Sequence, residues 1–464
     1  MEFKAGEIAS ICNGALLTGD KDTNINANVS IDTRTLQAGD FFVVIKGDNF
    51  DGHNFLSTAL DKGCSGCLIS SDIADDLKKK FFDNNIPLIK VNDTIEAFGK
   101  IATQWRKRIN AMVIAITGSS GKTTTKNMIA SVLQKNHKIT VAPKSFNNNI
   151  GVPWTICNVS KEDEFAVLEL GMNAFGEIEY LTKIAQPDIA VITNIGSAHI
   201  GKLGSLENIF LAKTELLRSM PDKGIAVVDR DSDFFTKFPI HLNKKIEFVN
   251  FGLNPDSDVK ADEIKNLSPY GYEFKLVFNN KSEKIKLNLF GEYNIKNALC
   301  ASAVLTKVGI GLKEIAEGLE EFVPYEMRSE IIDINGVMII QDFYNANPTS
   351  VEQSIKSFLN MEVEGDRYIV LGDMMELGEF TETMHKNIAE FLKKDLLKEL
   401  ITVGNFTKIT HENAKIKGIK SHHFENTQDA GNYLKEVVKK GDSVLLKASR
   451  LMKFENIIKA FLGN

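Results

Sequence analysis

The sequence predicts an α/β protein of three domains, and three observations support this fold class. The chain has 464 residues, which at roughly 150 residues per domain corresponds to about three domains. Apolar residues make up 43% and charged residues 25%, a balance that fills several cores and excludes a mostly disordered chain. Apolar, strand-like runs alternate with helical stretches along most of the chain, which is typical of parallel sheets.

Changes in this pattern predict the first two domains. Residues 1–98 are expected to form a small α/β unit, with strands at 41–47 and 67–70 on either side of a helix at 55–63. Residues 99–322 are expected to form a central domain on a parallel sheet, because their strand-like runs are continuously apolar. The elements expected there are strands at 113–117, 165–170 and 189–193, and a hairpin near 273–289.

Residues 323–464 repeat the alternation of strands and helices, which predicts a separate, doubly wound C-terminal domain. Its expected strands lie at 337–343, 367–373, 399–404 and 443–449.

Composition narrows the class of protein. The 55 basic and 61 acidic residues give a net charge of −6, a poor basis for broad nucleic-acid binding. The first residues lack the apolar core of a signal peptide, and no run of 18 apolar residues predicts a membrane helix. Five cysteines favour a reducing cytoplasm. Cys64 and Cys67 form a lone CxxC without a second ligand pair, so we interpret them as small packing residues.

The strongest local motif is TGSSGKTTT, residues 117–125, between a predicted strand and a predicted helix. Gly118 and Gly121 would let the backbone approach phosphate, Lys122 would reach the outer phosphates, and Thr123 would bind Mg²⁺. Ile116 stands where the general phosphate-loop motif has its first glycine. The context of strand and helix nevertheless predicts ATP as a ligand.

Two polar side chains at strand ends could complete a metal site. Glu169 ends the predicted strand at 165–170, and His199 follows the next strand. Ligands of open α/β sheets bind at the carboxyl ends of the strands, so both side chains are expected beside the phosphate loop.

Lys213 occupies an unusual place in a predicted amphipathic helix. Its spacing of three, four and seven residues from apolar neighbours puts it in the middle of the apolar face. That face is predicted to consist of Leu206, Ile209, Phe210, Leu216 and Leu217. A buried ammonium group is costly unless it is paired or modified, so we interpret Lys213 as functional.

Several segments together resemble one enzyme family. They are ITGSSGKTTT, SFNNNIGVP, LELGMNAFGEIEYL, NIGSAHI, LAKTELL, GEYNIKNALCASAV, DFYNANPTS and LGDMMELGE. In this order they resemble the ATP-dependent Mur ligases of cell-wall precursor synthesis, from about residue 30 to residue 455. The resemblance implies a UDP-sugar-binding N-terminal domain, a P-loop ATPase-type central domain and a Rossmann-like C-terminal domain. It also implies a reaction that joins D-alanyl-D-alanine to UDP-MurNAc-tripeptide through an acyl phosphate.

The resemblance assigns roles to individual residues. It implies that Glu169, His199 and Thr123 hold Mg²⁺, and that Lys213 is carbamylated and engages a metal ion. It implies catalytic roles for Lys122, Glu169, His199, Lys213 and Arg328. The residues expected to bind ATP are Gly118, Ser119, Ser120, Gly121, Lys122, Thr123, Thr124, Asn294, Asn297, Arg328 and Asp342.

Substrate-binding residues are expected in all three domains. These are Thr33, Arg34, Lys46, His53, Asn147, Asn148, Tyr344, Asn345 and Asn347. Asn149 stands where many relatives carry Glu, so it receives no catalytic role. The expected partners are UDP-MurNAc-tripeptide and D-alanyl-D-alanine, without nucleic acid, and the chain is expected to be a monomer.

Two other functions fit part of the sequence. A related ligase with another substrate, such as a folate polyglutamylating enzyme, shares the phosphate loop and GEYNIKNA, but DFYNANP and the N-terminal segment argue against it. An NTP-binding regulatory protein without ligase activity would not need Glu169, His199 and Lys213 together.

Overall fold

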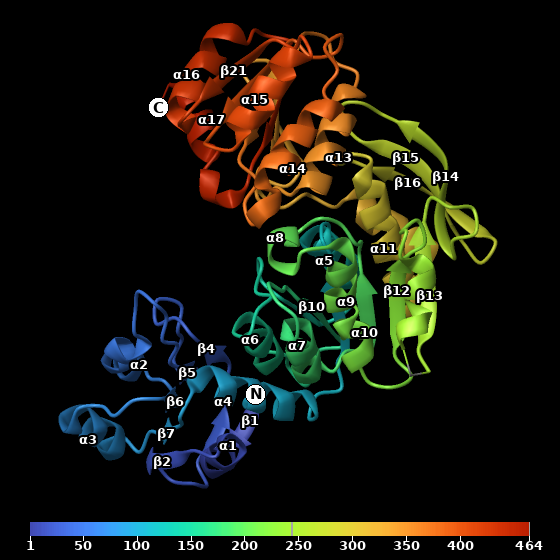
Figure 1. The fold of residues 1–464 in the computed structure, drawn as a ribbon. Helices are drawn as coiled ribbons and strands as arrows, with labels where there is room; N and C mark the ends of the chain where they lie inside the picture. Colours follow the sequence, from blue (N-terminus) through green and yellow to red (C-terminus); the bar gives the residue numbers. More distant parts are fainter. Residues whose placement is uncertain (243–244, 464) are drawn as a thin grey trace.

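The computed structural model describes residues 1–242 and 245–463 and contains three successive α/β units. Each unit has its own sheet, and Figure 1 shows the N-terminal unit in blue, the central unit mainly in green and the C-terminal unit in orange and red. The predicted fold class is confirmed. The domain boundaries stay our interpretation, and the one placed after residue 98 falls inside the helix α4 (Thr94–Arg106).

The N-terminal unit has a five-stranded sheet of order β2-β7-β6-β5-β4, in which only β2 is antiparallel to its neighbour. The strands are β2 (Ala15–Thr18), β4 (Val29–Ser30), β5 (Phe41–Val43), β6 (Gly66–Ile69) and β7 (Leu88–Lys90). Helices α1 (Ala5–Cys12), α2 (Leu56–Asp61) and α3 (Asp75–Asp83) flank it, and β1 (Glu2–Lys4) pairs with β3 (Asn24–Asn26).

The predicted strand at 41–47 is too long, because β5 ends at Val43. The chain then folds back on itself: Gly52 N–H donates to the Ile45 carbonyl, and Lys46 forms an isolated bridge with Asp51. The backbone groups after β5 therefore form hydrogen bonds within a loop instead of with a neighbouring strand.

Cys64 and Cys67 are buried where α2 meets β6, with their sulfur atoms 3.6 Å apart. All five cysteines are free. Within the described ranges, no group of three His, Cys, Asp or Glu side chains could hold a metal ion. The cysteine pair thus packs in the small apolar core of this unit, as the sequence indicated.

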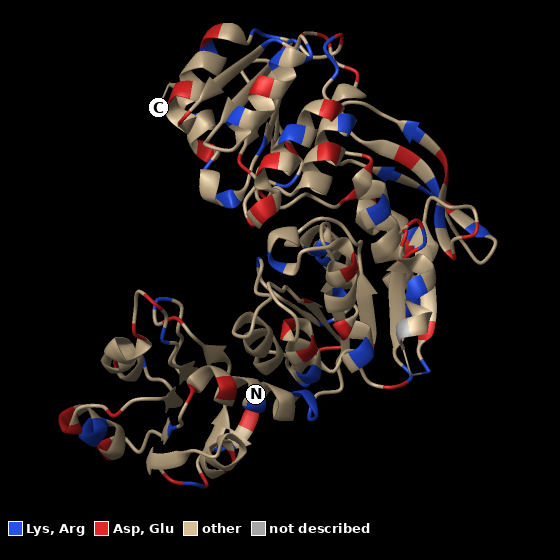
Figure 2. Cartoon of the chain, in the orientation of Figure 1, with Lys and Arg blue, Asp and Glu red and all other residues tan. Residues whose placement is uncertain are grey.

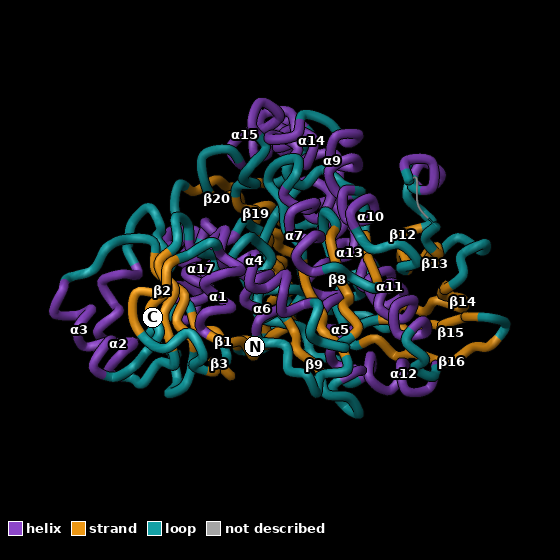
Figure 3. The backbone as a smooth tube through the Cα atoms, turned by 90° about the horizontal axis from the view of Figure 1, so that it is seen from below, coloured by secondary structure: helices purple, strands orange, loops and turns teal. Residues whose placement is uncertain are grey.

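The central unit has a nine-stranded sheet of order β16-β15-β14-β13-β12-β11-β8-β10-β9. Its parallel part comprises β8 (Met112–Thr117), β9 (Ile139–Val141), β10 (Phe165–Glu169), β11 (Ile189–Ile192), β12 (Ile225–Asp229) and β13 (Glu247–Gly252). The strands β14 (Val259–Asn266), β15 (Tyr272–Phe278) and β16 (Lys281–Leu287) run antiparallel to one another at one end, so the sheet is mixed and the predicted hairpin is confirmed. Figure 3 shows these strands side by side at one side of the molecule.

Helices cover the two faces of the central sheet because the inner strands are apolar on both faces. They are α5 (Lys122–Leu133), α6 (Gly151–Cys157), α7 (Glu177–Ala185), α8 (Ile200–Leu203), α9 (Leu206–Lys213), α10 (Glu215–Ser219), α11 (Tyr293–Lys307) and α12 (Leu312–Glu320). The helix predicted around Lys213 is divided into α9 and α10 at Thr214. Leu206, which the sequence placed on its apolar face, is 42% exposed because it begins α9 at the surface.

The C-terminal unit has a six-stranded sheet of order β17-β18-β22-β19-β20-β21, parallel except for β17. Its strands are β17 (Glu330–Ile334), β18 (Val337–Asp342), β19 (Arg367–Gly372), β20 (Glu399–Val403), β21 (Ser421–Phe424) and β22 (Ser443–Lys447). The helices are α13 (Pro348–Leu359), α14 (Thr381–Ile388), α15 (Thr407–Ile416), α16 (Thr427–Val437) and α17 (Glu455–Leu462).

Two general features bear on function. Figure 2 shows acidic and basic residues interspersed along all three units, as the small net charge leads us to expect. No helix in residues 1–242 or 245–463 is both long and apolar enough to cross a membrane.

Candidate active site

A cavity of about 340 Å³ lies between the central and C-terminal units. Many predicted site residues line it: Ser119, Ser120, Gly121, Lys122, Thr123, Thr124, Asn147, Asn148, Glu169, His199, Asn297, Arg328, Asp342, Tyr344, Asn345 and Asn347. Its volume is within the range of small-molecule sites. The strands β8, β10 and β18 carry their polar ends to this cavity, which explains how distant segments meet there.

The phosphate loop has the backbone shape that its glycines predicted. Gly118 has φ +147° and Gly121 has φ +79°. Residues that carry a side chain rarely adopt these backbone conformations. A Cβ atom on Gly118 would lie 1.9 Å from Thr193 Oγ1, and one on Gly121 would lie 2.2 Å from Asn297 Oδ1. Both positions therefore require glycine.

Lys122 begins α5 and is folded back over the loop, where its Nζ donates to the Gly118 carbonyl at 2.8 Å. Burial lowers the pKa of Lys122, and the carboxylate of Glu169 opposes this. Lys122 lines the cavity beside the loop, a position suited to bind a polyphosphate.

Glu169 is buried at the end of β10 and receives two side-chain hydrogen bonds. Thr123 Oγ1 donates to Glu169 Oε2 at 2.8 Å, and Asn147 Nδ2 donates to Glu169 Oε1 at 2.8 Å. The carboxylate thus connects the phosphate loop to the segment that carries Asn147. A hydroxyl and a carboxylate offer oxygen ligands of the kind that Mg²⁺ takes beside phosphate and water, and the His199 imidazole lines the same cavity.

His199 follows β11 and precedes α8, with φ +64°. Its Nδ1 lies 2.8 Å from Oε2 of Glu376, which belongs to the C-terminal unit and also has φ +64°. The contact with His199 lowers the pKa of Glu376 to about 2. His199 therefore lies at the junction of the two units as well as in the cavity wall.

Lys213 is 1% exposed, which confirms the burial that its helical position predicted. Burial lowers its pKa well below the usual value, and the nearby charge of Lys122 lowers it further. Lys213 does not itself line the cavity as Lys122 does. Lys213 is therefore buried outside the cavity wall, close enough to Lys122 for their charges to repel.

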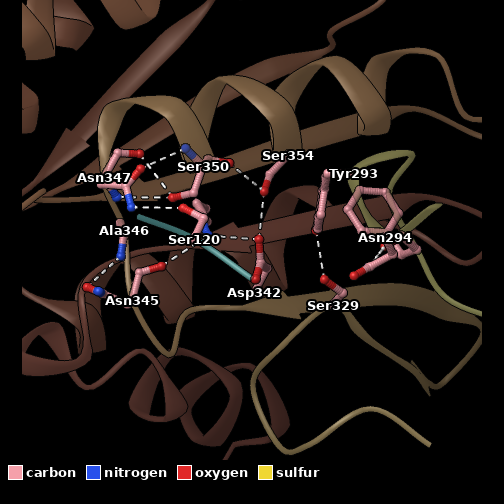
Figure 4. A network of polar contacts seen from close by, with 12 residues as sticks. Ser120, Tyr293, Asn294, Ser329, Asp342, Asn345, Ala346, Asn347, Ser350 and Ser354 are labelled. Carbon is pink, nitrogen blue, oxygen red and sulfur yellow. Dashed lines mark hydrogen bonds and ion pairs between the residues drawn. The ribbon is translucent and has the colours of Figure 1, made fainter. Parts of the chain in front are cut away.

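Asp342 ends β18, and its carboxylate accepts hydrogen bonds from two side chains of the same unit, of which Figure 4 labels Ser354. Ser354 Oγ donates to Asp342 Oδ2 at 2.6 Å, and Lys447 Nζ donates to the same oxygen at 2.8 Å. Lys447 also donates to the Asn345 carbonyl at 3.0 Å, which fixes the segment that follows β18.

Asn294 and Asn297 face each other on the first turns of α11, since Asn297 Nδ2 donates to Asn294 Oδ1 at 2.8 Å. Asn297 lines the main cavity, whereas Asn294 lines a smaller hollow beside it and donates to the Phe290 carbonyl. A role in contacting adenine stays a prediction for both.

Hydrogen bonds connect the C-terminal unit to the central unit around the cavity. Asn347 Nδ2 donates to Ser120 Oγ at 3.2 Å, as Figure 4 shows. The hydroxyls of Ser145 and Tyr344 lie 2.6 Å apart, and those of Ser197 and Thr349 lie 3.0 Å apart. The segment from Tyr344 to Thr349 is thereby held against the phosphate loop.

Arg328 stacks its guanidinium 3.9 Å above the Tyr344 ring centroid. Its Nε atom is buried and has no hydrogen-bond partner among the described residues. A guanidinium in a cavity wall with a spare N–H donor is suited to bind an anion such as phosphate.

The predicted residues of the N-terminal unit lie apart from this cavity. Arg34 pairs with Asp32, and Thr33 accepts a hydrogen bond from Lys62 Nζ at its carbonyl. Both ring nitrogens of His53 are engaged: Nδ1 lies 2.5 Å from Asp51, and Nε2 accepts from the backbone of Ser70 and Ser71. Substrate binding by these residues and by Lys46 stays a prediction.

Sequence reasoning missed three charged residues near the cavity. Lys447 ends β22, so the rule on strand ends that selected Glu169 and Asp342 could have found it. Lys126 lies one turn after Lys122 on a helix with a buried face, which is a weaker signal. Glu376 lies in the segment LGDMMELGE, four residues after β19 ends at Gly372, but it fits no periodic pattern that would single it out.

Comparisons with known proteins agree with this geometry. Residues 27–106 match the Mur ligase family catalytic domain, residues 116–305 the Mur ligase middle domain, and residues 327–450 the Mur ligase glutamate ligase domain. UDP-N-acetylmuramoyl-tripeptide–D-alanyl-D-alanine ligase of Bacillus subtilis is 33% identical over 97% of this chain and 96% of its own length. The ligase of the same name from Escherichia coli is 32% identical over 99% and 98%.

Solved structures agree over the same length. MurF from Acinetobacter baumannii superimposes with a TM-score of 0.86 at 31% identity, covering 100% of this chain and 99% of that one. MurF ligase from Thermotoga maritima, in complex with ADP, has a TM-score of 0.80 at 26% identity, covering 94% and 97%. With the phosphate loop, the strand-end carboxylates and three matching domains in place, the chain belongs to the Mur ligase family.

Proposed function

We propose that this protein is the ATP-dependent ligase that joins D-alanyl-D-alanine to UDP-MurNAc-tripeptide, giving UDP-MurNAc-pentapeptide for peptidoglycan synthesis. One observation carries the proposal: a single cavity combines the phosphate loop with Arg328 and Tyr344 on a chain that resembles such ligases along its whole length. We expect the reaction to take place in the cytoplasm, because it consumes ATP and the five free cysteines suit a reducing compartment.

The proposed chemistry follows from the low reactivity of a carboxylate. The terminal carboxylate of the tripeptide attacks the γ-phosphorus of ATP, the bond to the β-phosphate oxygen breaks, and an acyl phosphate and ADP result. The free amine of D-alanyl-D-alanine then attacks the acyl carbon, and phosphate leaves from the tetrahedral intermediate. The amine loses a proton to solvent or phosphate. Water must be kept out because acyl phosphates hydrolyse, and a cavity enclosed by two domains would serve this.

The cavity residues have distinct proposed roles in this reaction. Lys122 and Arg328 neutralise charge on the phosphoryl group as it moves. Thr123, Glu169 and His199 would hold Mg²⁺, which when bound supplies positive charge beside the phosphates. Asn294 and Asn297 would contact adenine, and Asp342, already fixed by Lys447, would contact the ribose.

Lys213 is proposed to react with carbon dioxide. Its lowered pKa favours the neutral amine, which can form an N–C bond to CO₂ and release one proton, leaving an anionic carbamate. The carbamate would place an anion near the cation Lys122, where an ammonium group would be both desolvated and repelled. Enzyme kept in CO₂-free buffer should then lose activity and regain it with bicarbonate, whereas the variant Lys213→Met should respond to neither.

The substrates are expected to extend from the cavity toward the N-terminal unit. The nucleotide end of UDP-MurNAc-tripeptide would lie near Thr33, Arg34, Lys46 and His53, and the peptide end near Asn147 and Asn148. Tyr344, Asn345 and Asn347 would contact the reacting groups from the C-terminal unit. We expect the monomer to be sufficient because both walls of the cavity come from one chain.

The deciding experiment measures phosphate release from Mg·ATP with UDP-MurNAc-tripeptide, with and without D-alanyl-D-alanine, and identifies the product by mass spectrometry. We expect release that requires both substrates, with UDP-MurNAc-pentapeptide as product. Lys122→Ala should lower kcat about 100-fold or more, and the exposed Lys79→Ala should leave it unchanged. ATP turnover without either substrate, or no pentapeptide, would refute the proposal in favour of another ligase or an NTP-driven regulator.

A further inference from the structure

The contact between His199 and Glu376 joins two left-handed residues from different units. Each has φ +64°, a conformation that is uncommon for residues other than glycine. Such backbone conformations cost free energy and persist where the surrounding structure enforces them, often at functional sites. Here the two side chains meet with His199 Nδ1 and Glu376 Oε2 2.8 Å apart.

Close backbone packing holds this contact in place. A Cβ atom on Gly201, two residues after His199, would lie 2.3 Å from the Leu377 carbonyl carbon and 2.4 Å from Gly378 N. The helix α8 therefore packs directly on the backbone around Glu376, and Figure 1 shows α8 facing the C-terminal unit. Lys202 adds a longer ion-pair contact to Glu376, at 3.5 Å.

The geometry at the imidazole determines which ring nitrogen is free. Nδ1 of His199 is buried and lies 2.8 Å from Glu376 Oε2 without forming an aligned hydrogen bond, so one of the two groups must rotate before Nδ1–H can donate. A cation in the cavity would then meet Nε2. Histidines that bind metals commonly donate their other ring N–H to a carboxylate, which fixes the tautomer and the ring orientation.

We infer that Glu376 is a positioning residue, which holds the Nδ1–H tautomer of His199 so that Nε2 presents its lone pair to a divalent cation bound with ATP. This inference rests on the proposed metal site. Because Glu376 comes from the C-terminal unit and His199 from the central unit, the cation site is complete only when the two units are together. Domain closure and cation binding thus favour each other.

The test measures Mn²⁺ binding by electron paramagnetic resonance in the presence of the β,γ-imido analogue of ATP, which needs no turnover. Glu376→Ala should weaken Mn²⁺ binding roughly tenfold or more, in line with other carboxylates that support metal-binding histidines. Glu376→Gln should keep binding within about threefold, because its amide oxygen can still accept from Nδ1–H. Glu379→Ala, three residues on and exposed, is the matched control.

Three results would overturn the inference. Mn²⁺ affinity of Glu376→Ala equal to that of the wild type would show that the carboxylate does not position His199. An equal loss of Mn²⁺ affinity in Glu376→Gln would show that Glu376 acts through its negative charge and not as a hydrogen-bond acceptor for His199. An equal loss in Lys202→Met would show that Glu376 acts through Lys202. If the wild-type protein bound no Mn²⁺ in the presence of the analogue, the proposed metal site itself would be refuted, and with it the role of Glu376. Thermal unfolding of each variant establishes that it is folded, which is expected because 44% of the Glu376 side chain is exposed.

Discussion

Replacing Lys126 by methionine should remove a pH dependence of stability that the wild-type protein owes to one buried ammonium group. Lys126 is 1% exposed, and its Nζ donates to the carbonyls of Ala142 at 2.7 Å and Lys144 at 2.6 Å. Burial lowers its pKa from 10.5 to about 8, and the carboxylate of Glu169 only partly offsets this.

The magnitude follows from this lowered pKa. The difference between 10.5 and about 8 is about 2.5 pKa units, which at 1.36 kcal/mol per unit is about 3 kcal/mol. Below pH 8 the amine is charged in the folded and unfolded states, and the folded state bears the whole desolvation cost. Between pH 8 and 10.5 the folded protein has released the proton that the unfolded chain still binds. The free energy of unfolding therefore rises with pH in this window and is level again above it.

The assay compares the unfolding temperatures of wild type and Lys126→Met from pH 7 to pH 10. Methionine leaves the carbonyls of Ala142 and Lys144 without their hydrogen-bond donor. This lowers the free energy of unfolding by about 1–3 kcal/mol for each carbonyl, at every pH. From pH 7 to pH 10 the wild type gains about 2.5 kcal/mol of the pH-dependent free energy. The difference between the two proteins should therefore grow with pH by about 5–10 °C, taking about 2–4 °C per kcal/mol for a domain of this size. The exposed Lys79→Met is the control. A difference that stays level or shrinks as pH rises would refute the reasoning.

Three further predictions address the contacts around the cavity. Gly201→Ala should force α8 away from Leu377 and raise the radius of gyration measured by X-ray scattering. Gly311→Ala is the control, because nothing lies within 4 Å of a Cβ atom at that position. Identical scattering profiles for Gly201→Ala and the wild type would contradict the prediction. Glu169→Gln should lower kcat about 100-fold or more, by loss of a charged metal ligand, while ADP affinity measured by calorimetry changes little; a normal kcat would exclude Glu169 from the site. Asp342→Asn leaves the buried Lys447 without its carboxylate, so the C-terminal unit should lose about 3–5 kcal/mol in calorimetric unfolding, and an unchanged transition would mean that the pair is not needed.

The features that sequence predicted best are those with a local physical cause. Continuous apolar runs specify strands buried on both faces, and glycines with positive φ specify the phosphate loop, so β8, β10 and the loop were found correctly. The burial of Lys213 followed from helical spacing, even though the helix is interrupted one residue later.

Features that depend on contacts between distant segments were not predictable in this way. The strand at 41–47 was overextended because its second half pairs within a loop that only the folded chain reveals. Glu376 reaches His199 because two glycine-containing segments of different units pack together, and no periodic pattern records that. Lys126 has an ordinary helical position, and only the folded loop supplies its two carbonyl partners.

The hydroxyl and amide contacts of Ser120, Ser145 and Ser197 with the C-terminal unit bear on how easily the two units can separate. Water can replace each of these hydrogen bonds at a net cost of about 0.5–1.5 kcal/mol. Apolar contacts also join the units, since one core cluster includes Ile200 and Leu203 of the central unit and Met374 and Leu377 of the C-terminal unit. Opening that exposes these side chains would cost additional free energy and uncover an apolar patch. The less time the molecule spends open, the fewer chances it has to associate with a neighbour through that patch.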